Sequence, residues 1–145
     1  MSFRFPLQAV LKYRENIERR EYLALGRIHQ QVAELEIQVR QAEELCAEAT
    51  RKREAQTQRG MASVHLQEAY QHEQALEMRR DHLRSRLQQL RIKLEECRKA
   101  YELARQKHEI VDELRTQRFD AYRREQAKQQ QLRIDDLFLS RRKRN

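Results

Sequence analysis

Apolar residues in the second half of the chain recur at alternating steps of three and four positions. This long ladder has fourteen members, eleven of them apolar, and neither Gly nor Pro interrupts it. A stripe this narrow, repeating every 3.5 residues, is buried by pairing with another helix. The pattern therefore predicts a long helix that requires a helical partner. Its members are Leu66, Ala69, Glu73, Leu76, Arg80, Leu83, Leu87, Leu90, Leu94, Cys97, Tyr101, Ala104, His108 and Val111.

The first half of the chain carries a matching short ladder. Between the two ladders, residues 50–60 are almost entirely polar and end at Gly60, the residue type preferred in a left-handed helix C-cap. Ser63 can then serve as the N-cap of the next helix. The chain is therefore predicted to fold back once, at about residues 58–62. The short ladder consists of Ile28, Val32, Leu35, Val39, Ala42, Cys46 and Ala49.

The predicted fold is all-α, a single antiparallel coiled-coil hairpin over residues 1–145. Helix 1 is expected at about 6–57, with Pro6 in its first turn. Helix 2 is expected at about 63–139, followed by a basic tail at 140–145. The longer second helix should overhang its partner by about 30 residues, roughly 45 Å at 1.5 Å per residue. The predicted coiled-coil core comprises Ile28, Val32, Leu35, Val39, Leu76, Leu83, Leu87, Leu90 and Leu94.

The fold-back also predicts which residues face each other, namely those whose numbers add up to about 115. Val39 then faces Leu76. Glu73 faces Ala42, where we expect weak packing between the helices. Arg80 lies opposite Leu35, with the aliphatic part of its side chain along the seam, the interface between the two helices.

This pairing places the two cysteines, Cys46 and Cys97, roughly 40 Å apart. We therefore expect both thiols to be reduced, because Cα atoms more than about 7 Å apart cannot be bridged by a disulfide.

Beyond His108 the same pairing leaves apolar residues with no helix to cover them. Exposed apolar side chains of this kind are typical of docking sites. Phe3 and Phe5 are expected at the same end of the hairpin. The uncovered residues are Ile110, Val111, Leu114, Phe119, Tyr122, Leu132, Ile134, Leu137, Phe138 and Leu139.

The composition supports long helices with a thin core. The chain is 37% charged, with two glycines, one proline and no tryptophan, whereas average domains carry about 12% Gly plus Pro. Such a chain lacks the turns of a multi-layer fold. Disorder, which a mean hydropathy of −1.08 would permit, conflicts with a sustained heptad register. The net charge of +8 is spread along the chain and favours acidic partners.

Several function classes are disfavoured. Catalysis needs a concave pocket that excludes water, which a helical hairpin lacks, so we expect neither an enzyme nor a bound cofactor. His65, Glu68 and His72 share a helical face, but the hairpin provides no closed ligand shell, so no metal site is expected. The basic run 141–144 follows the helix, whereas leucine-zipper proteins place theirs before the zipper; we expect no nucleic-acid partner.

The sequence predicts neither a secretory signal nor a transmembrane segment, and the chain is expected in the cytoplasm. No apolar run near the N-terminus has the length of a signal peptide, and no stretch approaches the length that crosses a bilayer.

Both ends of the chain resemble the FliJ family, the small coiled-coil proteins of the bacterial flagellar export apparatus. The opening FRFPLQAVLKYRENIE is similar to the family's start, and ARQKHEIVDELRTQRFDAYRREQAKQQQLRIDDLFL resembles its final segment. The ending Ile134-Asp135-Asp136-Leu137 has Asp where the family usually has Glu. The resemblance covers nearly the whole chain, including the glycine at the turn.

The resemblance implies a non-catalytic stalk, similar to the central stalk of rotary ATPases. It implies binding to the hexameric flagellar export ATPase, promotion of ATPase assembly, contact with the membrane protein of the export gate and exchange of export chaperones, at the cytoplasmic face of the inner membrane. A virulence type III secretion stalk and a nucleic-acid-binding coiled coil are the alternatives. Gate binding is assigned to Tyr70 and Glu77. Ring binding is assigned to Phe3, Phe5, Leu7, Arg123, Arg124, Asp135, Asp136 and Leu137.

Overall fold

The computed structural model describes residues 2–144 and contains two long helices packed against each other. Helix α1 spans Gln8–Gln58 and helix α2 spans Ser63–Arg142, and no strand occurs within the described residues. This confirms the all-α fold with a longer second helix. The chain divides into two compact units, which are described separately: unit 1 is Met1–Arg20 with Glu102–Asn145, and unit 2 is Glu21–Tyr101.

The turn between the helices depends on Gly60. Its φ of +80° lies in the left-handed region, where side chains with a Cβ are strained, and its N–H donates to the Thr57 carbonyl at 3.2 Å. Ser63 is the first residue of α2 rather than its N-cap. The Ala62 carbonyl accepts the N–H of Leu66 at 3.1 Å, so Ala62 occupies the capping position.

The outer ends of the helices also differ slightly from expectation. Helix α1 begins two residues after Pro6, with the Gln8 N–H bonded to the Phe5 carbonyl at 3.1 Å. Helix α2 continues to Arg142, so the first three residues of the expected basic tail are helical.

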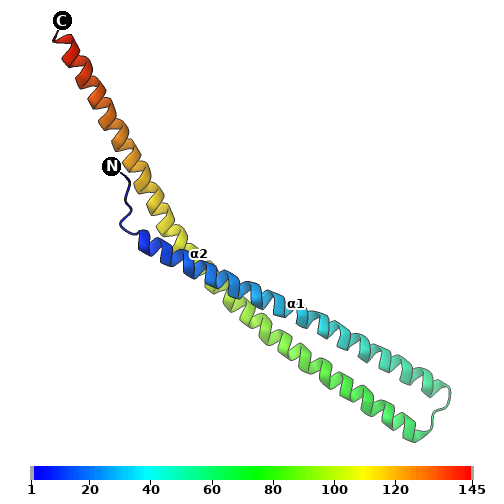
Figure 1. Ribbon diagram of the computed structural model, residues 1–145. Helices are drawn as coiled ribbons and strands as arrows, with labels where there is room; N and C mark the ends of the chain where they lie inside the picture. The colour runs from blue at the N-terminus through cyan, green and yellow to red at the C-terminus, as the bar shows by residue number, and fades with distance from the viewer. Residues whose placement is uncertain (1, 145) are drawn as a thin grey trace. The chain divides into compact units, whose positions relative to one another are not determined.

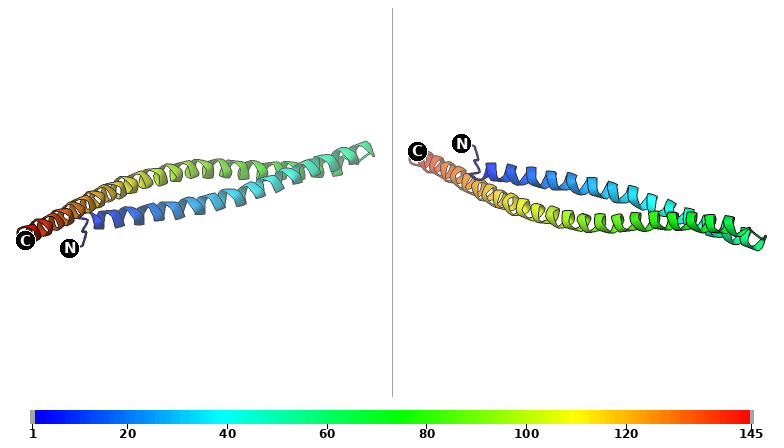
Figure 2. Two further views of the ribbon diagram at one scale, coloured as in Figure 1. Left: turned by 90° about the horizontal axis from the view of Figure 1, so that it is seen from above. Right: turned by 90° about the horizontal axis from the view of Figure 1, so that it is seen from below.

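Unit 2 holds the main apolar core. In Figures 1 and 2 the two helical stretches of this unit run antiparallel, side by side, on either side of the turn. Eight of the nine predicted core residues belong to this core; Leu76 is half-buried nearer the turn. Every member of both ladders is buried or half-buried. The core consists of Val32, Leu35, Val39, Ala42, Leu83 and Leu87, with Ile28, Leu90 and Leu94 packed against it.

The predicted pairing of the ladders, in contrast, is wrong. Arg84 Nη2 lies 2.8 Å from Glu43 Oε1, and the rings of Tyr22 and Tyr101 are 5.7 Å apart. These pairs have number sums of 127 and 123 instead of 115, so α2 is displaced by about one heptad or slightly more. Sliding a ladder by a heptad leaves apolar residues facing apolar residues, so the ladders alone do not select a register. The short connection from Gln58 to Ser63 selects it.

Glu73 is not the weak point that the predicted register implied, because it faces Thr50 and Arg53 rather than Ala42. The Thr50 hydroxyl donates to Glu73 Oε1 at 2.5 Å and Arg53 Nε donates to Oε2 at 2.6 Å. Arg53 also lies over the Tyr70 ring, 4.6 Å from its centroid. The Thr50 hydrogen bond, followed by that of Arg53, lowers the pKa of the buried Glu73 carboxylate despite the opposing effect of burial.

Two further expectations concern Arg80 and the cysteines. The corrected register moves Arg80 away from Leu35, and its guanidinium lies 3.1 Å from the carboxylate of its neighbour Asp81. Cys46 and Cys97 are both free thiols, as expected.

The register can be tested by crosslinking thiols introduced at Glu43 and Arg84 in a Cys46→Ala, Cys97→Ala background. Because their side chains are in contact, a short bifunctional maleimide should join them within one chain. The matched pair, Glu43 with His72, follows the register predicted from the ladders and should crosslink poorly, because position 72 lies about 18 Å away along α2. Preferential crosslinking of the second pair on a denaturing gel would contradict the register.

The two glycines should respond oppositely to replacement by alanine. Gly26 lies in the middle of α1, and a Cβ added there would meet nothing within 4 Å. Gly26→Ala should therefore raise the free energy of unfolding by about 1 kcal/mol. Gly60→Ala should lower it by about 1–2 kcal/mol, because its φ is positive. Urea unfolding followed by circular dichroism measures both; equal effects would contradict the assigned turn.

The polar layer formed by Glu73, Thr50 and Arg53 should make the free energy of unfolding depend on pH. Because the folded-state pKa of Glu73 is lowered, its contribution is fully present above the unfolded value of about 4.5 and is lost as the pH falls through the folded pKa. Glu73→Gln removes this contribution. The variant should be less stable than the parent at pH 7, and the difference should shrink towards pH 3. Urea midpoints at the two pH values measure it; a difference independent of pH would show that Glu73 acts without its charge.

Candidate docking surfaces

An aromatic cluster at the start of the chain covers part of α2 in unit 1. The Phe3 ring packs edge-on against Phe119 at 5.2 Å between centroids and lies 5.5 Å from Tyr122. Phe5 and Leu11 are buried, at 8% and 3% exposure. Phe119 and Tyr122 therefore have an intramolecular partner, contrary to the expectation that they lie on an uncovered overhang.

The uncovered part of α2 consequently starts later than predicted. Gln126 is the last half-buried residue, and every residue from 127 to 144 is exposed. We call residues 127–144 the terminal arm. Its helical part, 127–142, is about 24 Å long at 1.5 Å per residue, roughly half of the expected overhang. The register shift explains the difference, because it carries the start of the chain further along α2.

The terminal arm combines large apolar side chains with positive charge. Six basic and two acidic residues give it a formal net charge of +4. Successive residues of a helix are rotated by 100°, which places Ile134, Leu137 and Phe138 on one side and Leu132 and Leu139 on the other. The arm is therefore apolar on two sides, unlike the single stripe of a coiled coil. The exposed fractions are 56% for Leu132, 47% for Ile134, 63% for Leu137, 70% for Phe138 and 59% for Leu139.

The predicted ring-binding residues fall into two groups. Phe3 and Phe5 pack within unit 1, whereas Leu7 is 36% exposed. Arg123 and Arg124 are exposed just before the arm, and the guanidinium of Arg123 lies 6.0 Å from the Phe119 ring centroid.

Within the arm, Asp135 accepts a hydrogen bond from Gln131 Nε2 at 3.0 Å. Asp136 and Leu137 are exposed. Asp135, Asp136 and Leu137 therefore lie in the terminal arm, among its exposed apolar residues. Phe5, by contrast, is buried outside the arm.

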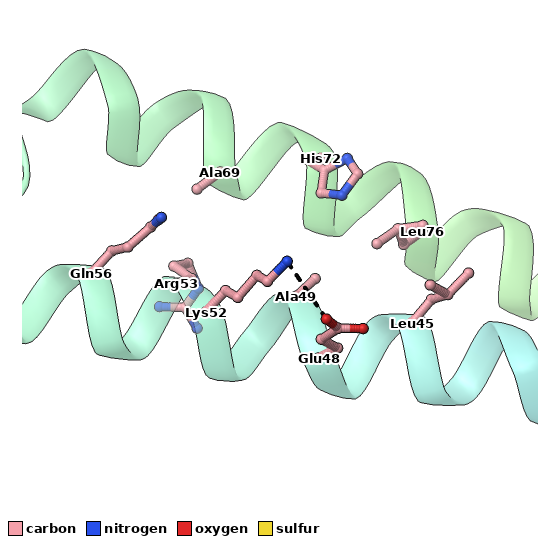
Figure 3. Close-up of a pocket in the computed structure, with 9 residues that line it drawn as sticks. All are labelled: Leu45, Glu48, Ala49, Lys52, Arg53, Gln56, Ala69, His72 and Leu76. Atoms are coloured by element: carbon pink, nitrogen blue, oxygen red, sulfur yellow. Dashed lines mark ion pairs between the residues drawn. The ribbon is translucent and has the colours of Figure 1, made fainter.

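Unit 2 carries a shallow groove of about 510 Å³ beside the seam, near the turn. Figure 3 shows the short side chains of Ala49 and Ala69 where the two helices face each other, with Leu45 and Leu76 at one end. Lys52 reaches over the groove to Glu48 at 3.5 Å.

The predicted gate-binding residues do not line this groove. Tyr70 is stacked under Arg53, and Glu77 is exposed elsewhere on α2.

A second polar layer, formed by His108, Glu15 and Glu18, lies in unit 1 and was not predicted from the sequence. His108 Nδ1 is 2.5 Å from Glu18 Oε2, and His108 Nε2 is 3.7 Å from Glu15 Oε1. The available signal was a histidine on the long ladder and two carboxylates on the first helix. Only the correct register brings them together.

Metal ligation and membrane crossing find no support in the described residues. His65 Nδ1 lies 3.8 Å from Glu68 Oε2, with both side chains about 70% exposed. Residues 2–144 contain no group of three or more potential metal ligands. Neither α1 nor α2 has a stretch that is apolar enough to cross a bilayer.

Comparison with known proteins identifies the family. The family model described as flagellar FliJ protein matches residues 3–145. The match includes both the aromatic segment at the start of the chain and the terminal arm. No curated protein and no solved structure matches the chain. Because the match covers practically the whole sequence, this chain belongs to the FliJ family of the flagellar export apparatus.

Proposed function

We propose that this component of the flagellar export apparatus is a non-catalytic stalk that binds the hexameric export ATPase through its terminal arm and promotes assembly of the ring. The observation that carries the proposal is the exposure of every residue from 127 to 144, with large apolar side chains on two sides of the helix. A helix with apolar residues on more than one side is stable when a partner surrounds it. A socket at the centre of a ring meets that requirement, whereas a flat surface would cover one side.

The positive charge of the terminal arm also supports binding inside a socket of the ring. A net charge of +4 favours a socket with acidic walls, and the attraction would guide the arm into it before apolar contacts form. Asp135 and Asp136, at the middle of the apolar stretch, would meet basic groups of the ring. Arg123 and Arg124 would lie at its mouth, next to the aromatic cluster of Phe3.

For the surface of unit 2 near the turn we propose contact with the membrane protein of the export gate. Leu45, 51% exposed at the edge of the groove in unit 2, offers an apolar contact there. Tyr70 would contribute only its exposed edge, because Arg53 covers one ring face. Such contact would hold the chain at the cytoplasmic face of the inner membrane, where it could also exchange export chaperones.

Removal of the terminal arm tests the ring proposal. A chain ending at Gln126 keeps Tyr122 and the Phe3 cluster, so circular dichroism should show an intact coiled coil. Binding to the export ATPase should weaken by at least about tenfold, or 1.4 kcal/mol, and stimulation of hexamer assembly and ATP hydrolysis should be lost. Sedimentation with the purified ATPase measures binding and assembly.

Point variants provide the matched control for this truncation. Leu137→Ser with Phe138→Ser should reproduce the loss, whereas Met78→Ser, at a 73%-exposed apolar residue of unit 2, should bind normally. Unchanged ring binding by the truncated chain would refute the proposal. If the arm instead binds duplex DNA with an affinity that falls steeply with salt concentration, the nucleic-acid alternative is favoured.

A further inference from the structure

The two flanks of the seam in unit 2 differ in how their charges are matched. On one flank, arginines of α2 lie against carboxylates of α1. Arg84 Nη2 is 2.8 Å from Glu43 Oε1, and one heptad further along α2 Arg91 Nη2 is 3.1 Å from a carboxylate oxygen of Glu36. Opposite charges beside the apolar stripe join the two helices of a coiled coil in this way. We call this side the paired flank.

The other flank carries positive charge without such a match. A step of two residues along a helix is a rotation of about 200°, which leads from the paired flank to the opposite side of the seam. On α2 this step leads to Arg86 and Lys93, which continue a heptad series that starts at Arg79. On α1 it leads to Gln38 and Leu45. We call this side the open flank.

The cations of the open flank have no ionic partner within the described part of the chain. Arg79, Arg86 and Lys93 are exposed, and no ion pair or hydrogen bond joins their side chains to another residue of 2–144. Among the helical neighbours three or four positions away, one carboxylate occurs, Glu96. The residues that α1 places beside these cations are neutral. The design that strengthens the paired flank is therefore absent here.

Apolar surface borders these cations. The groove of about 510 Å³ lies on the open flank, because Leu45 and Lys52, one heptad apart, both line it. Figure 3 shows Leu45 and Leu76 together at one end of the groove; Leu45 is 51% exposed and Leu76 is half-buried. Leu90, one turn after Arg86, is half-buried as well. A partner on this flank would gain apolar contacts next to a row of positive charges.

We propose that the open flank binds an acidic amphipathic helix of a partner protein, which packs along the seam as a third helix. Arg79, Arg86 and Lys93 follow each other at intervals of about 10.5 Å along α2. A helix with Glu or Asp at every seventh position, beside a narrow apolar stripe, matches each cation once and covers the half-buried leucines. A nucleic acid would neutralise the same cations but gain nothing from Leu45.

This inference goes beyond the ring proposal and does not depend on it. All the residues concerned belong to unit 2, and none belongs to the terminal arm. Leu45 is the one residue shared with the proposed gate contact, and the variants below leave it unchanged. Loss of the open-flank site would therefore not be confused with loss of either proposed contact.

Binding of a designed acidic helix to the full-length chain tests the proposal. The probe is a fluorescein-labelled helical peptide of about four heptads, with one Leu in each heptad and a Glu beside it. A second peptide has Gln in place of every such Glu. Because three ion pairs would be lost, fluorescence anisotropy should show at least about tenfold tighter binding of the acidic peptide.

Neutral variants test whether the cations of the open flank bind the probe. The chain with Arg79→Gln, Arg86→Gln and Lys93→Gln should bind the acidic peptide about tenfold more weakly than the parent. Circular dichroism should show an intact coiled coil, because these side chains have no partner in the fold. The matched control has the same change of net charge at exposed residues of unit 2 away from the open flank, namely Arg40→Gln, Arg51→Gln and Lys99→Gln, and should bind like the parent.

Three results would overturn the proposal. The first is that the parent does not distinguish the acidic peptide from the Gln peptide. The second is that the open-flank variant binds as tightly as the parent, or that the control variant weakens by the same factor, which would leave only an effect of net charge. The third is that duplex DNA binds the parent more tightly than the acidic peptide does and loses affinity in the open-flank variant, which would favour a nucleic-acid partner.

Discussion

The fold depends on a narrow seam between two long helices. Each helix contributes a single stripe of side chains at heptad spacing, and none of the described side chains is fully buried; the best-covered, Leu11, retains 3% exposure. Without a thick core, stability must come from many modest contacts along the seam. Each contact requires the opposite helix to lie at the correct axial position. Register is therefore the quantity on which the rest of the structure depends.

The sequence predicted which residues lie in the seam but not which ones face each other. All members of both ladders are buried or half-buried, because heptad spacing depends only on the rotation of each helix. Pairing depends on axial position, to which the ladders are nearly indifferent over one heptad. The ends of the helices carry the missing information: with α1 ending at Gln58 and α2 beginning at Ser63, the short turn excludes a pairing of Val39 with Leu76.

Polar residues in the ladder take on a different meaning once the register is known. Glu73 and His108 interrupt the apolar pattern and look like defects in the sequence. In the structure each faces polar groups of α1, Thr50 with Arg53 in one unit and Glu18 in the other. A shifted register would leave these groups buried without partners, at greater cost than the loss of an apolar contact. We infer that both layers oppose slippage that the apolar residues would tolerate.

The same register explains why the docking proposal rests on the terminal arm rather than on everything beyond His108. Phe119 and Tyr122 pack against Phe3 at the start of the chain, and residues 127–144 form the stretch in which every residue is exposed. Within it, Leu132 and Phe138 point to different sides of the helix, so a third helix lying alongside would cover only one of them. The seam requires a single partner helix in a single register, whereas the terminal arm requires a partner that surrounds it. That difference separates the part of α2 that holds the fold together from the part available for binding.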